Sequence, residues 1–238
     1  MTSAAVGFDF DHTLGLDHKL ERSVALELLA GLARERGIAY DAARAFAGIE
    51  GVIADYRAGR VGLEIALEAY FSSVLGPDPE ILSLAARFRS EAVRRAPEFV
   101  SILSGVPELL AELRARNVPY AILTNGWSPL QEEKARLIGF DATVLVSERI
   151  GARKPEAGAF EILATHLGCP LERLWYVGDD PLTDCSGARG AGATAVWFDW
   201  EGHEYPDSLA PPDFVIHALR ELPELLQGRS SEAANPSG

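Results

Sequence analysis

Two aspartates, one residue apart, end the first apolar run of the chain. Asp9 and Asp11 follow residues 4–8, which are all small or apolar. Residues two apart in an extended segment point to the same face, so both carboxylates should enter one crevice, about 6 to 7 Å apart along the backbone. One carboxylate could then attack as a nucleophile while the other moves protons. Their mutual repulsion also favours a divalent cation nearby.

Polar residues also follow the later apolar runs of the chain. These residues are Thr124 and Asn125 after the run at 120–123, Lys154 after the run at 142–146, and Asp179 and Asp184 after the run at 174–177. In an open parallel sheet, the carboxyl ends of neighbouring strands converge on one crevice where ligands bind. The pattern therefore predicts a charge-balanced site for a cation together with an anion.

Helical periodicity replaces the strand pattern between the first motif and residue 100. Four apolar stripes occur there, and a glycine or proline follows each of them, at Gly37, Gly59, Gly76 and Pro97. Four helices without an intervening strand indicate a small bundle, joined to the rest by hinges near residues 15–17 and 97–101. From Gly105 onward, strands alternate with helices, which indicates parallel βα units with later strands at 194–198 and 214–216.

The motifs taken together resemble those of a known family. In chain order, D-x-D-x-T, T-N, G-x-x-K-P and G-D-D-x-x-x-D are similar to the four motifs of the haloacid dehalogenase (HAD) superfamily. The resemblance covers the chain from about Val6 to Leu226 and implies an α/β fold, a Rossmann-like parallel sheet core with an inserted four-helix cap. We assign residues 1–15 and 100–228 to the catalytic core and residues 16–99 to the cap. Residues 229–238 contain no large apolar side chain and are expected to form a disordered tail.

The resemblance implies a role for each aspartate of the first motif. Asp9 would attack phosphorus and form an aspartyl-phosphate, and Asp11 would protonate the leaving alkoxide and then deprotonate the attacking water. Superfamily dehalogenases lack the second aspartate, because halide leaves without a proton. Asp11 therefore favours phosphoryl transfer over carbon–halogen cleavage.

A Mg²⁺ site and a phosphate site follow from the same resemblance. The metal would be held by the Asp9 and Asp179 carboxylates, by the Asp11 main-chain carbonyl, and by Asp184 through a water, since Mg²⁺ prefers oxygen ligands and keeps several waters. Asp180 precedes Pro181, and a helix N-cap accounts for it. The residues expected to bind and neutralise the phosphate are Thr124, Asn125 and Lys154.

Three further residues are candidates for substrate specificity. His12 stands where the superfamily usually has glycine, and its imidazole could narrow the pocket, contact substrate or point away. Arg57 and Arg60 lie in a turn between the second and third predicted helices, where an arginine could clamp an anionic leaving group bidentately. A solvated turn is the alternative for each arginine.

Composition restricts the partners of the protein. The chain has 238 residues, 47% of them hydrophobic and 24% charged, as expected of a soluble globular protein of one or two domains. A net charge of −13 argues against nucleic acid as a partner. No apolar run approaches the roughly 20 residues that cross a bilayer, and the N-terminus shows no signal peptide. We expect a cytoplasmic protein whose oligomeric state stays open.

The sequence thus predicts a Mg²⁺-dependent phosphatase acting on a small phosphorylated metabolite. It resembles the phosphoglycolate phosphatase and nucleotidase branch of the superfamily. Two alternatives stay open: a phosphomutase resembling β-phosphoglucomutase, which shares every core residue named above, and a non-catalytic regulatory protein with the same fold.

Overall fold

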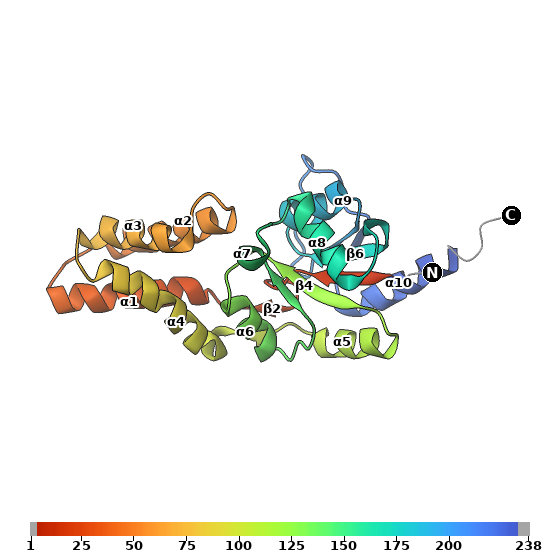
Figure 1. The fold of residues 1–238 in the computed structure, drawn as a ribbon, viewed down its shortest axis with the longest axis horizontal. Helices are drawn as coiled ribbons and strands as arrows, with labels where there is room; N and C mark the ends of the chain where they lie inside the picture. The colour runs from red at the N-terminus through yellow and green to blue at the C-terminus, as the bar shows by residue number, and fades with distance from the viewer. Residues whose placement is uncertain (1–3, 233–238) are drawn as a thin grey trace. The chain divides into compact units, whose positions relative to one another are not determined.

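A computed structural model describes residues 4–232, which divide into two compact units (Figure 1). Of the described residues, 4–16 and 101–232 form the sheet unit, and Asp17–Val100 form the helical unit. These boundaries differ by one residue from those expected for the core and the cap. Among the described residues, no helix is long and apolar enough to cross a membrane.

Six parallel strands form the main sheet, in the order β5-β4-β1-β6-β7-β8. The strands are β1 (Ala5–Phe8), β4 (Tyr120–Thr124), β5 (Val144–Val146), β6 (Leu174–Gly178), β7 (Thr194–Phe198) and β8 (Phe214–Ile216). The predicted parallel sheet is confirmed, and β7 and β8 have the predicted bounds. Phe8 of β1 lies opposite Ile122 of β4 on one side and Val177 of β6 on the other. The residue after Phe8 therefore emerges between the ends of two neighbouring strands.

Helices cover both faces of this sheet, as a Rossmann-like α/β fold requires. Figure 1 shows α8 (Ala157–Leu167) and α9 (Gly187–Ala191) on one face, and α5 (Val106–Ala115) and α6 (Leu130–Leu137) on the other. Further helical segments of the sheet unit are α7 (Ser147–Ile150), η1 (Leu171–Arg173), the π-helical turn η2 (Pro181–Ser186), η3 (Leu219–Glu221) and α10 (Leu222–Glu232).

The predicted disordered tail is wrong for residues 229–232. Helix α10 continues through them to Glu232. It packs against α5 through its apolar first turns, where Leu222 and Leu226 are buried, and the helix extends beyond that contact. Residues 233–238 of the predicted tail lie outside the described part of the chain.

The helical unit contains four helices and is inserted between β2 (Gly15–Leu16) and β3 (Ser101–Ile102), which pair antiparallel. The helices are α1 (Leu20–Arg36), α2 (Ala42–Arg57), α3 (Leu63–Leu75) and α4 (Ile81–Phe99).

Helix α1 is capped at its C-terminus by Gly37, whose φ of 67° is the left-handed conformation typical of such a cap. Pro97 was expected to end the fourth helix, but α4 runs through it to Phe99. In the last turn, the missing proline N–H costs the helix only one hydrogen bond.

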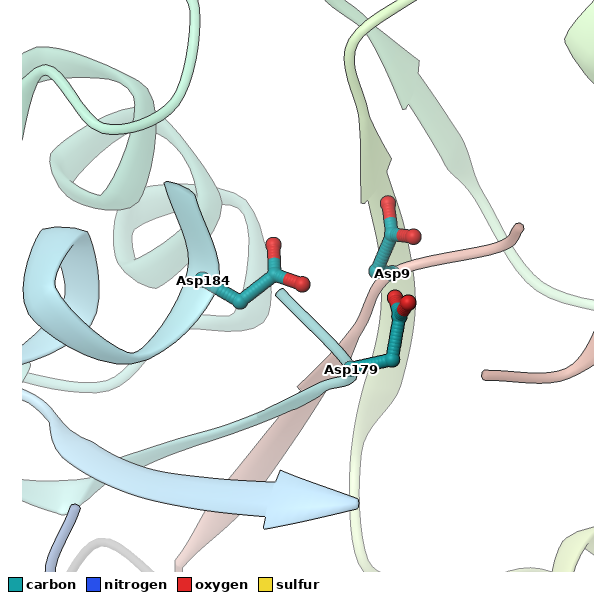
Figure 2. Close-up of side chains that lie close together, drawn as sticks. All are labelled: Asp9, Asp179 and Asp184. Atoms are coloured by element: carbon teal, nitrogen blue, oxygen red, sulfur yellow. The ribbon is translucent and has the colours of Figure 1, made fainter. Parts of the chain in front are cut away.

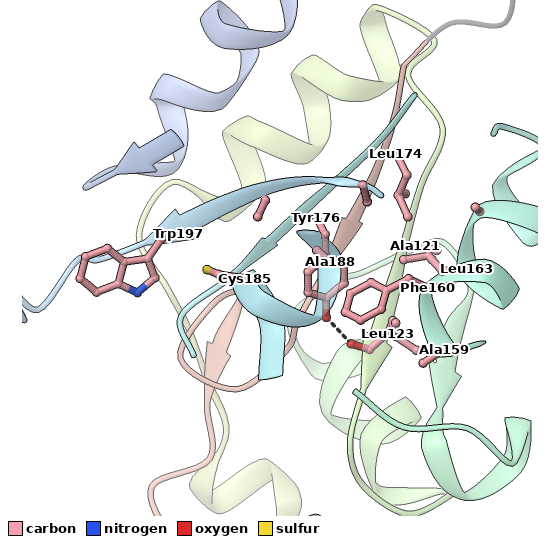
Figure 3. Close-up of a cluster of buried hydrophobic side chains, with 13 residues drawn as sticks. Ala121, Leu123, Ala159, Phe160, Leu163, Leu174, Tyr176, Cys185, Ala188 and Trp197 are labelled. Carbon is pink, nitrogen blue, oxygen red and sulfur yellow. Dashed lines mark hydrogen bonds between the residues drawn. The ribbon is translucent and has the colours of Figure 1, made fainter. Parts of the chain in front are cut away.

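Tyr176 of β6 lies at the centre of the buried cluster between the sheet and helix α8 (Figure 3). Its hydroxyl donates a hydrogen bond to the Leu123 carbonyl oxygen at 2.7 Å, and its ring meets Phe160 edge-on at a centroid distance of 5.0 Å. The ring passes over Gly7, its register partner on β1. A Cβ at Gly7 would lie 2.8 Å from a Tyr176 ring carbon and 2.4 Å from Leu163 Cδ2. Glycine at this position therefore leaves space for the core.

We predict that Gly7→Ala lowers the free energy of unfolding by about 1 to 3 kcal/mol, because the added methyl group overpacks a core fixed by a hydrogen bond. Urea unfolding measures the change. Gly31→Ala is the matched control, since nothing lies within 4 Å of a Cβ at that position in α1. It should be neutral or stabilise the protein by up to about 1 kcal/mol. Equal effects of the two substitutions would contradict the packing argument.

Candidate active site

Three carboxylates meet at the carboxyl end of the sheet. Asp9 follows β1, Asp179 follows β6, and Asp184 belongs to the turn η2. One carboxylate oxygen from each lies within 4.8 Å of the other two, and Figure 2 shows the three side chains close together. Asp9 and Asp184 are buried, and Asp179 is partly buried. The sheet thus brings Asp9, from the first motif, close to Asp179 and Asp184, from the last motif.

Electrostatic repulsion among these acids is strong. Burial, followed by the charges of Asp184 and Asp9, raises the pKa of Asp179 to about 9. Burial also raises the pKa of Asp184 to about 7, against the opposing effect of the Lys154 ammonium. Converging oxygen donors that need positive charge fit a hard divalent cation such as Mg²⁺. Asp184 reaches the same point as the other two acids, so the geometry allows a direct ligand as well as the expected water-mediated one.

Lys154 joins two of the three acids. Its ammonium lies 2.6 Å from Asp9 Oδ1 and 2.7 Å from Asp184 Oδ1, and the side chain is buried. Burial by itself would lower the pKa of Lys154, but the Asp184 and Asp9 carboxylates hold it well above its usual value. The ammonium therefore stays charged beside the predicted nucleophile.

The Gly178-Asp179-Asp180 turn returns the chain toward Asp184. The Asp180 carboxylate accepts hydrogen bonds from the Leu182 and Thr183 N–H groups at 2.8 and 2.7 Å, so its interpretation as a helix N-cap is confirmed. The Asp180 N–H donates to Asp184 Oδ2 at 3.0 Å. A Cβ at Gly178 would lie 2.2 Å from the same oxygen. Glycine at 178 is needed for Asp184 to approach the backbone.

Asn125 holds the main chain of Lys154. Its Nδ2 donates to the Lys154 carbonyl oxygen at 2.8 Å, and its Oδ1 accepts from the Lys154 N–H at 3.0 Å. This bidentate contact joins two motifs 29 residues apart and was not expected from the sequence. Thr124 is buried at the end of β4. Phosphate binding by Thr124 and by the Asn125 main chain stays a prediction.

Asp11 is paired with a lysine that the sequence analysis missed. Lys134 lies on α6, its side chain has no solvent exposure, and its ammonium contacts Asp11 Oδ1. A lysine within a helix usually faces solvent, so its position alone gave no signal. The composition did contain a signal, because lysine is rare in this chain. Among 22 lysines and arginines, only Lys19, Lys134 and Lys154 are lysines.

His12 adopts a backbone conformation that glycine favours. Its φ is 59°, and the Trp200 indole N–H donates to its carbonyl oxygen at 2.9 Å. This explains why glycine is usual at the position, since a side chain there requires a left-handed backbone. The residue is solvent-exposed. Its part in specificity stays a prediction.

Both candidate arginines form ion pairs inside the helical unit. Arg57 contacts Glu21 at 3.0 Å, and Arg60 contacts Asp55 at 2.7 Å. The Arg60 side chain is 63% exposed, in keeping with a solvated turn. Their role as an anion clamp stays a prediction.

Comparison with known proteins identifies the family of the chain. The family model described as haloacid dehalogenase-like hydrolase matches residues 4–192. The chain belongs to this family of hydrolases. The HAD hydrolase is 32% identical over 245 residues to a phosphoserine phosphatase from Thermus thermophilus, covering 90% of this chain and 95% of the relative. The resemblance inferred from the four motifs is confirmed.

Solved structures that share the fold of this HAD hydrolase include a phosphatase and a dehalogenase. A HAD phosphatase from Thermococcus onnurineus superposes with a TM-score of 0.70 and 26% identity, covering 94% of this chain and 98% of that one. A 2-haloacid dehalogenase from Pseudomonas syringae superposes with a TM-score of 0.72 and 24% identity, covering 96% and 99%. The fold is therefore shared between two chemistries, and the site residues must distinguish them.

We predict that the metal-free HAD hydrolase becomes less stable as pH rises from 6 to 8.5. Burial and the neighbouring acids raise the pKa of Asp179 in the folded protein to about 9, from an ordinary value of 3.8, so the folded state holds a proton that the unfolded chain has lost. The free energy of unfolding should therefore fall across this window, on the order of 2 kcal/mol. Asp184, with a folded pKa of about 7, adds to the fall.

Urea unfolding in EDTA at both pH values measures this effect. Saturating Mg²⁺ should stabilise the protein, and more so at pH 8.5, because the cation replaces the protons. Asp179→Asn should reduce both the pH dependence and the Mg²⁺ effect. A Mg²⁺ effect of the same size in Asp179→Asn would contradict the assignment of the metal site.

Proposed function

We propose that this HAD hydrolase is a Mg²⁺-dependent phosphatase that hydrolyses the phosphate monoester of a small metabolite through an aspartyl-phosphate on Asp9. The observation that supports it is the pairing of Asp9 with the buried ammonium of Lys154, beside Asp179 and Asp184. A second acid, Asp11, stands two residues further along the chain. These residues would supply a nucleophile with positive charge beside it and, two residues further along the chain, an acid–base group.

In the first half-reaction, a carboxylate oxygen of Asp9 attacks phosphorus and the phosphorus–oxygen bond to the leaving group breaks. Asp11 transfers a proton to the departing alkoxide, which leaves as an alcohol. The Lys154 ammonium offsets charge on Asp9 and on the phosphoryl oxygens. A bound Mg²⁺ would be held by Asp9, Asp179 and Asp184 and would neutralise negative charge on the phosphoryl group.

In the second half-reaction, water attacks the phosphorus of the aspartyl-phosphate. Asp11, now ionised, accepts a proton from that water, and the bond between phosphorus and the Asp9 oxygen breaks. Inorganic phosphate leaves, and Asp9 and Asp11 return to their starting states. Thr124 and the main chain of Asn125 would bind the phosphoryl oxygens in both steps.

Asp11 is the residue that favours a phosphatase over a dehalogenase. Halide leaves carbon without protonation, so a dehalogenase has no use for an acid at this position. The Asp11 carboxylate in this protein is held by a buried lysine, which supports a function in the reaction more than a solvated loop position. The phosphatase relative of 32% identity, which this chain matches over 95% of its length, supports the same conclusion.

The first substrate to test is phosphoserine, because that relative bears the name of a phosphoserine phosphatase. We further propose that the helical unit acts as the cap that selects the substrate. The candidate substrate contacts are His12 of the sheet unit and, in the helical unit, Arg57 at the end of α2 and Arg60 after it. Arg57 thus ends the helix and does not lie in the turn predicted from the sequence. Closure of such a cap would exclude bulk water while the aspartyl-phosphate forms.

Phosphate release from a panel of esters tests the proposal. The panel contains phosphoserine, phosphoglycolate, a sugar phosphate and a nucleoside monophosphate, with Mg²⁺ or EDTA. We expect Mg²⁺-dependent release, its loss in Asp9→Asn because the nucleophile is removed, and a decrease of about 10² to 10⁴ in Asp11→Asn. Asp207→Asn is the matched control, since Asp207 is exposed in a loop of the sheet unit.

Two results would contradict the phosphatase assignment. One is phosphate release that persists in Asp9→Asn, since a reaction through an aspartyl-phosphate on Asp9 would then be ruled out. The other is chloride release from 2-chloropropionate without phosphate release from any ester. Phosphate transferred to a sugar in preference to water would instead identify the phosphomutase.

A further inference from the structure

Lys134 is buried without solvent exposure in a protein that uses arginine for nearly all of its cations. It lies on α6, on the face that also buries Leu130 and Gln131. Its ammonium contacts Asp11 Oδ1 and lies 5.0 Å from the centre of the Phe10 ring, itself fully buried. Two consecutive residues of the first motif therefore surround this one ammonium.

Burying an ammonium is unfavourable unless a charged partner and good geometry compensate for the lost hydration. The Asp11 carboxylate supplies the opposite charge, and the Phe10 ring supplies a cation–π contact. The Asp11 side chain is itself only 16% exposed. A solvated surface pair would contribute little and would not require a lysine buried in helix α6.

Lysine is suited to this position by its shape. Its ammonium is a compact charge on a flexible stem, whereas the arginine guanidinium is a planar fork that needs room for two parallel hydrogen bonds. Of the chain's three lysine positions, Lys134 and Lys154 are buried, and each contacts an acid of the first motif. Elsewhere in the described residues, exposed carboxylates are paired with arginines such as Arg136 and Arg60.

We propose that Lys134 is a positioning residue for the reaction, which holds the Asp11 carboxylate where it can exchange a proton with the leaving group and with the attacking water. This inference rests on the proposed phosphatase function. Asp11 lies in a loop after β1, so its backbone alone leaves the side-chain rotamer undetermined. The contact with α6, 123 residues away in sequence, selects one position for Oδ1.

A double-mutant cycle tests this coupling. Lys134→Met removes the charge and keeps most of the volume, and it is measured in the parent and in Asp11→Asn with the best ester of the panel. We expect kcat to fall about 10- to 100-fold in the parent, since a displacement of about 1 Å at a reacting group can cost about 10²-fold. KM should change less than about threefold, and in Asp11→Asn the same substitution should change kcat less than about threefold.

Arg136→Met is the matched control, because Arg136 is a cation two positions along the same helix and is 67% exposed. It should leave kcat within about twofold. Equal losses from Lys134→Met in both backgrounds would overturn the proposal and assign Lys134 a structural role only. No loss in the parent would also overturn it. Lys134→Gln, which keeps a donor on the side chain, replaces Lys134→Met if circular dichroism shows that the methionine variant does not fold.

The crystal structure of the folded Lys134 variant gives a second readout that does not need turnover. The Asp11 carboxylate should move from its present position, while the contact between Lys154 and Asp9 stays. An unmoved Asp11 carboxylate would overturn the inference even if the protein is a phosphatase. A moved carboxylate in a protein that releases no phosphate would support the positioning contact and contradict the proposed function instead.

Discussion

Mutual repulsion of three clustered carboxylates, two buried and one partly buried, is the constraint on which the site in the sheet unit depends. Asp9, Asp179 and Asp184 lie so close that burial and charge raise the pKa of two of them. Their convergence is possible because Lys154 supplies a buried positive charge at 2.6 and 2.7 Å. Gly178 leaves space for Asp184, and Asn125 fixes the main chain of Lys154, so much of the neighbouring structure serves this one electrostatic arrangement.

The central position of β1 connects this arrangement to the chemistry. Because β1 pairs with β4 and β6, segments from both sides of the sheet reach the loop that carries Asp9 and Asp11. Each acid consequently has a lysine of its own, Lys154 for Asp9 and Lys134 for Asp11. The two acids are only two positions apart in sequence but are held by separate parts of the fold, which would let them carry out the two different functions proposed for them.

The fold was largely predictable because its patterns are local. Alternation of strands and helices indicated the parallel sheet, and the glycine at 37 indicated the end of the first helix. Two predictions about helix ends were wrong, because the residue types alone did not determine where the helix stops. Pro97 lies so near the end of α4 that its missing N–H costs only one hydrogen bond, and α10 extends through residues whose composition suggested disorder.

Some features of the candidate site were likewise predictable from the sequence, and others were not. The sequence by itself identified the motif acids and Lys154, because their positions after apolar runs place them at one end of a parallel sheet. Only the tertiary structure decided which groups touch. It paired Lys134 with Asp11 and the Asn125 side chain with the Lys154 main chain, and it kept Arg57 and Arg60 in ion pairs of the helical unit. The positions of the motifs predict which side chains lie at the edge of the sheet. Burial and charge compensation between segments distant in sequence depend on tertiary packing, so the sequence pattern does not show them.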